Sequence, residues 1–196
     1  MMAAVILSAG ESSRMGRPKA LLPIDGETFI ERIVGALRRT SVGRVIVVLG
    51  YNADEMKGQI VHLPVEILIN PDYKLGQLSS LQVAVRRLQN DPDCEGILLH
   101  LVDHPYIDAK LVETMIEKFR ASGHLIVMPR YGGKGGHPVI FSHKLFSELL
   151  AAPLDQGAKA VVNAHRDEIL VIESQDAGVT VDIDTPELYR QYVKDN

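Results

Sequence analysis

The sequence predicts an α/β fold with a mainly parallel sheet, because short apolar runs alternate with amphipathic helical patterns along most of the chain. A Gly-rich stretch over residues 131–141 interrupts this alternation and predicts a small antiparallel excursion. The sequence contains no linker-like segment and no internal repeat. The 196 residues are therefore expected to form one domain, residues 1–196.

The expected strands are short runs rich in apolar and β-branched residues. The segment 96–102 is expected at the centre of the sheet, and the segments 44–49 and 65–69 are expected to be buried. In chain order, the expected strands cover residues 3–8, 44–49, 65–69, 96–102, 125–128, 169–172 and 180–183.

The expected helices carry apolar residues at helical spacing. Thr28 and Glu31 can form a capping box at the first helix, and Asp108 is the expected cap of the helix after the central strand. Thr185 is expected to open the last helix, with Pro186 in its first turn. Helical patterns cover residues 29–37, 78–88, 111–119, 142–150 and 158–164.

The composition is that of an ordinary globular protein, with 46% apolar and 23% charged residues. A formal net charge of −4 argues against a nucleic-acid surface built on bulk positive charge. The single cysteine, Cys94, excludes an internal disulfide and suits the cytoplasm. The sequence shows neither a signal-peptide pattern nor a membrane-span pattern, so we expect a cytoplasmic protein without nucleic-acid or membrane partners.

The loop between the first expected strand and the first expected helix has the composition of a phosphate-binding turn. Gly10 and Gly16 permit a ligand to approach the backbone closely, and small neighbours leave backbone N–H groups available to phosphate oxygens. Arg14 and Lys19 would neutralise a triphosphate. The glycine spacing fits neither a Walker A loop nor a dinucleotide-binding motif. A surface loop with incidental basic residues is the alternative interpretation.

Acidic residues in two segments predict a metal site. Asp103 stands at the carboxyl end of the expected central strand, a position from which a carboxylate can hold Mg²⁺. Asp182 and Asp184 alternate about Ile183 and would face the same side of an extended segment, so either can join Asp103 on the metal. The alternative is that Asp103 and Asp184 only cap the segments that follow them.

The segment Leu7-Ser8-Ala9-Gly10-Glu11-Ser12-Ser13-Arg14-Met15-Gly16-Arg17-Pro18-Lys19 resembles the L-x-[AG]-G-x-[SG]-x-R-M-G-x-x-K signature of the MobA-like NTP transferases, the family of the molybdenum cofactor nucleotidyltransferases. Later landmarks follow in the family's order, so the resemblance covers nearly the whole chain. It implies a three-layer, Rossmann-like fold of the glycosyltransferase-A type and a Mg²⁺-dependent nucleotidyltransferase activity. It also implies that Arg14 and Lys19 contact the triphosphate and that Asp103 binds the metal. Asp184 is favoured over Asp182 as the second metal ligand.

Other segments extend the resemblance to the base, the ribose and the acceptor. Residues 76–81 are similar to the family's G-M-x-x-S-L segment, and Asn70 is expected to border the same pocket. Residues 132–138 are similar to the G-x-x-G-H-P-V segment of the cytidylyltransferases, which implies an acceptor contact for His137. Lys159 replaces the Arg of the family's G-D-x-G-A-R, so a bidentate hydrogen-bond contact to the acceptor is not expected there. The implied nucleotide-binding residues are Leu7, Ser8, Ala9, Gly10, Ser12, Arg14, Gly16, Lys19, Asn70, Gly76, Ser79 and Ser80, and the implied acceptor-binding residues are His137 and Lys159.

One position departs from the family pattern. His104 stands where the family often has Gln or Met between Asp103 and Pro105. A direct contact of His104 with the metal is not expected, because Mg²⁺ prefers oxygen donors.

The resemblance favours CTP and a molybdopterin-type cofactor as substrates, because residues 8–10 and 137–138 are closer to the cytidylyltransferases than to the guanylyltransferases. A molybdoenzyme that receives the product is an implied partner. The alternatives are a molybdopterin guanylyltransferase and a nucleotidyltransferase acting on a sugar 1-phosphate or another small phosphate. A non-catalytic nucleotide-binding or cofactor-insertion protein is the alternative from another class.

Overall fold

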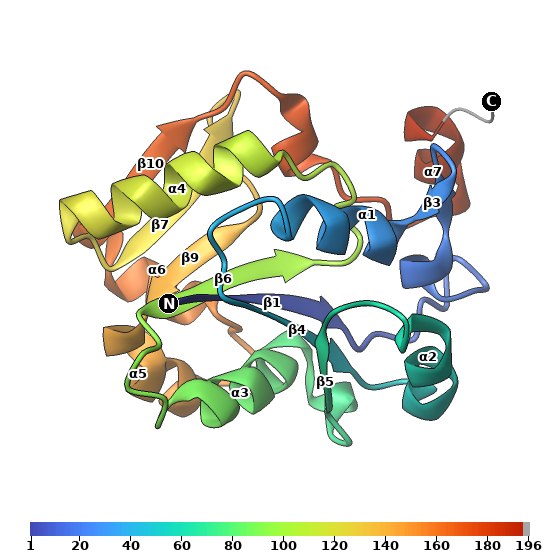
Figure 1. Cartoon of the computed structure of the whole chain (residues 1–196), viewed down its shortest axis with the longest axis horizontal. Helices are drawn as coiled ribbons and strands as arrows, with labels where there is room; N and C mark the ends of the chain where they lie inside the picture. The colour runs from blue at the N-terminus through green and yellow to red at the C-terminus, as the bar shows by residue number, and fades with distance from the viewer. Residues whose placement is uncertain (194–196) are drawn as a thin grey trace.

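The computed structural model describes residues 1–193, and its centre is an eight-stranded mixed sheet (Figure 1). The strand order is β10-β7-β9-β6-β1-β4-β5, with β8 paired to β7. All neighbours are parallel except β9, which runs antiparallel between β6 and β7, and the short β8. The strands of this sheet are β1 (Met2–Ser8), β4 (Arg44–Leu49), β5 (Glu66–Ile69), β6 (Gly96–Leu101), β7 (Ile126–Tyr131), β8 (Lys134–Gly135), β9 (Val139–Ser142) and β10 (Ile169–Glu173). The predicted mainly parallel sheet with a small antiparallel excursion is confirmed.

Helices cover both faces of the sheet and make it the middle of three layers (Figure 1). Successive residues of β1 point to opposite faces: Ala4 packs against the side of α1, α2 and α4, whereas Val5 packs against the side of α3, α5 and α6. No helix within the described residues is long and apolar enough to cross a membrane. The helices are α1 (Phe29–Leu37), α2 (Ala53–Ile60), α3 (Gln77–Leu88), α4 (Ala109–Ser122), α5 (Phe146–Ala151), α6 (Lys159–Ala164) and α7 (Pro186–Tyr192), with 3₁₀ turns η1 (Lys19–Leu21), η2 (Tyr73–Leu75), η3 (His143–Leu145), η4 (Arg166–Glu168) and η5 (Ala177–Thr180).

The predicted helix caps are present. The Thr28 hydroxyl accepts a hydrogen bond from the Glu31 backbone N–H at 3.3 Å, and the Glu31 carboxylate accepts one from the Thr28 N–H at 2.7 Å. The bonds from Thr28 hold the pKa of Glu31 below its usual value. Asp108 caps α4 by accepting from the Lys110 N–H at 2.9 Å, and Thr185 caps α7.

Two local predictions differ from the structure, and one helix was not predicted. The segment 65–69 was expected to be a buried strand, but β5 is the edge strand and Ile69 is 44% exposed. The expected strand 180–183 is wrong: η5 covers its start, and the backbone N–H of Ile183 bonds to Asp103 instead of a strand ladder. Helix α2 was not predicted, because only Met56 and Ile60 are buried along it.

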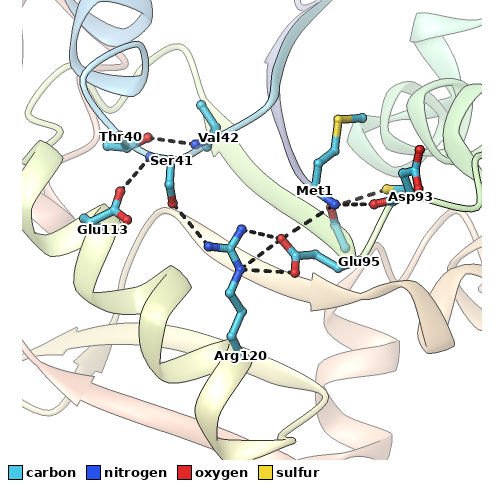
Figure 2. Close-up of polar contacts among 10 residues, drawn as sticks. Met1, Thr40, Ser41, Val42, Asp93, Glu95, Glu113 and Arg120 are labelled. Carbon is cyan, nitrogen blue, oxygen red and sulfur yellow. Dashed lines mark hydrogen bonds and ion pairs between the residues drawn. The ribbon is translucent and has the colours of Figure 1, made fainter.

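Charged side chains of α4 contact the loops at the amino-terminal edge of the sheet (Figure 2). Arg120 of α4 donates to both carboxylate oxygens of Glu95, just before β6, over 2.6 to 3.2 Å. Glu113 of the same helix accepts from the Ser41 backbone N–H at 2.6 Å. The hydrogen bonds from Arg120 are the main reason why the pKa of Glu95 lies below its usual value. These contacts fix α4 at the edge opposite the one where the parallel strands end.

Candidate active site

A pocket of about 670 Å³ opens at the carboxyl ends of the parallel strands. Strand β1 lies between β4 and β6. The chain adds β4 and β5 on one side of β1 and then crosses to add β6 on the other side, so the strand order reverses at β1. Ligands of open α/β sheets bind at such a point. Of the predicted nucleotide and metal residues, those that line the pocket are Leu7, Ser8, Ala9, Gly10, Ser12, Arg14, Gly16, Lys19, Gly76, Ser80, Asp103 and Asp184.

The loop after β1 is folded by Ser12. This residue has a left-handed backbone with φ 51°, and its carbonyl accepts hydrogen bonds from the N–H groups of Met15 at 2.9 Å and Gly16 at 3.2 Å. The Ser12 hydroxyl accepts from the Lys19 N–H at 3.2 Å. Gly16 continues the turn with φ 68°, a conformation that L residues with a side chain rarely adopt. The turn therefore brings Lys19 back toward the ends of the strands.

Lys19 joins the first loop to the acidic residues. Its ammonium nitrogen lies 2.9 Å from a carboxylate oxygen of Asp103 and also donates to Asp184. Burial alone would lower the pKa of Lys19, but the two carboxylates outweigh it and raise that pKa. Arg14 donates to the second oxygen of Asp184 at 2.5 Å. The amino-terminal loop and the acid after the central strand thus converge in one pocket.

Ile183 holds two further acids beside Asp103. Its N–H donates to the Asp103 carbonyl at 2.9 Å, and its side chain is fully buried. Asp182 and Asp184 therefore flank Asp103. Burial and the charges of Asp103 and Asp184 raise the pKa of Asp182 to about 6. The pKa of Asp184 is lowered, because the hydrogen bonds and charges of Lys19 and Arg14 outweigh its burial.

One group of side chains fits a divalent cation. Asp103, His104 and Asp182 each offer a donor atom, and these atoms lie within 4.8 Å of one another. His104 is only 8% exposed, and its Nδ1 atom has no hydrogen-bond partner among residues 1–193. Two carboxylates and an imidazole nitrogen are a donor set that a divalent cation would satisfy. Asp184, favoured as a ligand from the sequence, instead accepts from Lys19 and Arg14 in this structure.

The two predicted acceptor residues lie outside the lining of the pocket. The ring of His137 lies 4.9 Å from that of His104 and 6.3 Å from that of His100. Burial lowers the pKa of His100 to about 3 and that of His137 to about 4, so both are neutral at neutral pH. Lys159 is exposed at the start of α6.

Asn70 and Ser79 lie behind the wall of the pocket. Asn70 is 2% exposed, and its amide donates to the hydroxyls of Ser79 at 2.8 Å and Ser80 at 2.9 Å. Its carbonyl oxygen accepts from the Asp72 N–H at 3.0 Å. Of these predicted residues, only Ser80 lines the pocket, and Asn70 fixes its position.

Sequence reasoning missed the wall formed by the segments after β4 and β5. Tyr51 and Tyr73 line this side of the pocket, with ring centroids 6.2 Å apart and an edge-on geometry. The Tyr51 N–H donates to the Ala9 carbonyl at 3.1 Å, which connects this wall to the first loop. The parallel strand order could have predicted this wall, because a ligand site at the carboxyl end of β1 also involves the loops that follow its neighbouring strands. Other lining residues that were not predicted are Glu11, Ser13, Arg17, Pro18, Ala20, Asn52, Glu55, Met56, Gln77, Leu101 and Val102.

The fold and the pocket are those of a nucleotidyltransferase: a three-layer sandwich whose first loop and central acid converge at the strand ends. The chain belongs to the MobA-like NTP transferase family, whose domain model matches residues 4–169.

Relatives of the chain carry different names. It is 30% identical to the molybdenum cofactor cytidylyltransferase of Escherichia coli (strain K12) over 93% of this chain and 91% of that protein. It is 29% identical to the nicotine blue oxidoreductase of Paenarthrobacter nicotinovorans, over 95% and 94% of the two chains. The crystal structure of Rv0371c from Mycobacterium tuberculosis H37Rv superposes with a TM-score of 0.86 at 28% identity, covering 100% of this chain and 99% of that one. A complex of Rv0371c with manganese has a TM-score of 0.81 at 27% identity, with the same coverage.

Proposed function

We propose that the chain transfers CMP from CTP to the phosphate of a molybdopterin-type cofactor and releases pyrophosphate. The observation that carries the proposal is the 2.9 Å contact between Lys19 and Asp103, which joins the phosphate-binding loop to the acidic centre inside one pocket. The choice of CTP and of this acceptor is supported by the E. coli cytidylyltransferase, which aligns with nearly the whole chain.

The reaction is an in-line displacement. An oxygen of the acceptor phosphate attacks the α-phosphorus of CTP and forms the new P–O bond. The bond from the α-phosphorus to the bridging oxygen breaks, and that oxygen leaves with the pyrophosphate. An acceptor phosphate is already ionised at neutral pH, so the chain needs no strong general base. Its contribution is to position the reactants and to stabilise charge.

The basic residues of the first loop stabilise the departing pyrophosphate. Lys19 and Arg14 are held by Asp103 and Asp184 before the nucleotide binds. When a triphosphate enters, its oxygens replace these carboxylates as partners of the two cations. The side chain of Lys19 is only 13% exposed, so its charge acts where solvent screens it little.

The acids provide the metal site. Two pairs of carboxylate ligands are open, and Asp103 belongs to both. The second carboxylate comes from Asp182 or from Asp184. To bind the metal, Asp184 has to give up its ion pairs with Lys19 and Arg14. Asp182 forms no ion pair with either of these basic residues. Mg²⁺ suits such oxygen donors, and the manganese complex of Rv0371c supports a divalent cation in this family. When bound, the ion would neutralise charge on the α-phosphate.

The test is pyrophosphate release from each of the four common NTPs, with molybdopterin and with a panel of sugar 1-phosphates as acceptors. We expect release only with CTP and molybdopterin, and the cytosine dinucleotide form of the cofactor as the product. The variant Asp103→Asn should lose activity by a factor of about 10²–10³, while the exposed Asp54→Asn on α2 should not. A preference for GTP or for a sugar phosphate would replace the proposed substrates. Nucleotide binding without pyrophosphate release from any acceptor would refute transfer itself.

A further inference from the structure

We infer that His104 is a nitrogen ligand of the metal site and that, with Asp103 and Asp182, it makes the site prefer Mn²⁺ to Mg²⁺. The inference deepens the proposed function, since it concerns the same site. It differs from the all-carboxylate site expected from the sequence, in which Asp184 was favoured and His104 had no contact with the metal.

The first support is an unsatisfied donor set. His104 is 92% buried, and its Nδ1 atom lacks a hydrogen-bond partner within residues 1–193. Buried polar atoms nearly always have a partner. Nδ1 of His100 and of His137 also lacks one, but within the described residues only His104 of these three is grouped with carboxylates. A ring nitrogen of His104 and oxygens of Asp103 and Asp182 already lie within 4.8 Å of one another.

The second support is that the backbone and the ring of His104 are held in place. Its N–H donates to the Leu101 carbonyl at 3.1 Å, and its own carbonyl lies 2.8 Å from Nε2 of His100. Its ring packs against the ring of His137 at 4.9 Å. A ligand that is fixed before the metal arrives loses little conformational freedom on binding.

The third support is the arrangement of the cations. Lys19 and Arg14 form ion pairs with Asp184, and Lys19 also with Asp103, but neither forms one with Asp182. Asp182 would therefore bind a metal without first releasing a basic side chain, whereas Asp103 would exchange Lys19 for the metal. A cation bound by Asp103, His104 and Asp182 leaves Asp184 in place to orient the two basic residues of the phosphate-binding loop.

The chemistry of the donors sets the preference. Mg²⁺ is bound almost entirely by oxygen ligands, whereas imidazole suits the first-row transition ions. Carboxylates suit Mn²⁺ as well as Mg²⁺. A site with two carboxylates and one imidazole nitrogen is thus better matched to Mn²⁺, and Mg²⁺ gains little from the third ligand.

The decisive measurement is pulsed electron paramagnetic resonance of Mn²⁺ bound to the whole chain without nucleotide. We expect a nitrogen hyperfine coupling that changes when the histidines are labelled with ¹⁵N and disappears in His104→Gln. Titration should show Mn²⁺ binding at least about tenfold tighter than Mg²⁺, and His104→Gln should weaken Mn²⁺ binding by about 10–100-fold. The matched control is His62→Gln, since His62 is exposed and pairs with Glu31, and neither residue lines the pocket.

Two further variants separate the possible ligand sets. Asp182→Asn should weaken Mn²⁺ binding about as much as His104→Gln, and Asp184→Asn should weaken it much less. Bound Mn²⁺ without nitrogen coupling in the wild-type chain would overturn the inference, whether or not His104→Gln folds. That result would leave CMP transfer intact. Conversely, nitrogen coupling in a chain that transfers no nucleotide would support the inference and refute the proposed function.

Discussion

Lys19 and Asp103 are 84 residues apart in the sequence, and the ammonium group of one lies 2.9 Å from the carboxylate of the other. This contact makes the loop after β1 and the end of β6 one functional unit. Because Lys19 also donates to Asp184, one partly buried cation connects three separate parts of the chain.

Replacing Lys19 by Met should slow pyrophosphate release at saturating nucleotide by about 10²–10³-fold, because a group that stabilises charge in the transition state is lost. The matched control is Lys57→Met, which removes an exposed lysine from α2. Rates are measured by a coupled pyrophosphate assay. A Lys19→Met rate within about threefold of wild type would show that Lys19 has no role in the chemical step.

Replacing Gly50 by Ala should disturb the wall of the pocket. A Cβ at this position would lie 2.7 Å from the Ala9 carbonyl oxygen and 2.5 Å from Cβ of Tyr73, so the backbone of the first loop must shift. We expect a loss of stability of about 1–3 kcal/mol and a nucleotide Kd raised about tenfold. Thermal unfolding and calorimetric titration measure the two effects.

Gly58→Ala is the control for this change, because a Cβ at Gly58 in α2 meets nothing within 4 Å. It should stabilise the chain by about 0.5–1 kcal/mol, since Ala has the higher helix propensity. If Gly50→Ala leaves nucleotide affinity unchanged, the wall after β4 does not contact the ligand.

Replacing Asn70 by Ala should destabilise the fold and weaken nucleotide binding together. The buried hydroxyls of Ser79 and Ser80 lose a shared donor, which costs about 1–3 kcal/mol. Because Ser80 lines the pocket, its displacement should also raise the nucleotide Kd. The control is Asn163→Ala on α6, an exposed asparagine that bonds to Arg166. Equal Kd values for Asn70→Ala and wild type would restrict Asn70 to a purely structural role.

His165 should make stability depend on pH. Hydrogen bonds to Glu168 at 2.5 Å and Glu148 at 2.7 Å raise its pKa above the usual 6.5. Folding therefore favours the protonated ring, and the stabilisation is complete below the unfolded-state pKa and lost as pH rises through the folded-state value. Both carboxylates are about half exposed, so the contribution is at most about 1 kcal/mol.

The measurement for His165 is thermal unfolding of wild type and His165→Gln at about pH 5.5 and about pH 8.5. The difference in Tm should be larger at the lower pH. The variant Glu168→Gln should reduce that difference, because it removes the largest cause of the raised pKa. A Tm difference that does not change with pH would mean that the two glutamates do not hold the proton on His165.

Local sequence signals predicted much of the fold. The capping box of Thr28 and Glu31 depends on residues three positions apart, and the buried strands β1, β4 and β6 depend on apolar runs. The convergence of Lys19 and Asp103 was also predictable, because both follow neighbouring parallel strands whose carboxyl ends meet at one edge.

Other features depend on contacts between distant segments, which local patterns do not encode. The segment 180–183 has the composition of a strand. However, the N–H of Ile183 donates to the Asp103 carbonyl, and the Ile183 side chain is buried beside Phe29 and Leu22. The grouping of His104 with Asp182 results from that bond, so no spacing in the sequence reveals it. Asn70 was predicted to border the pocket, but its side chain faces the protein interior and holds α3.

The bond from Ile183 to Asp103 gives the last part of the chain an influence on the chemistry. Residues 174–183 form the only covalent route from β10 to that bond, and they lie beyond the stretch that the family's domain model matches. Lengthening or shortening this strap would move Asp182 relative to His104, and it would also move Asp184, which pairs with Lys19 and Arg14 of the first loop. The length of a peripheral segment can in this way alter the cation site and the phosphate-binding residues together.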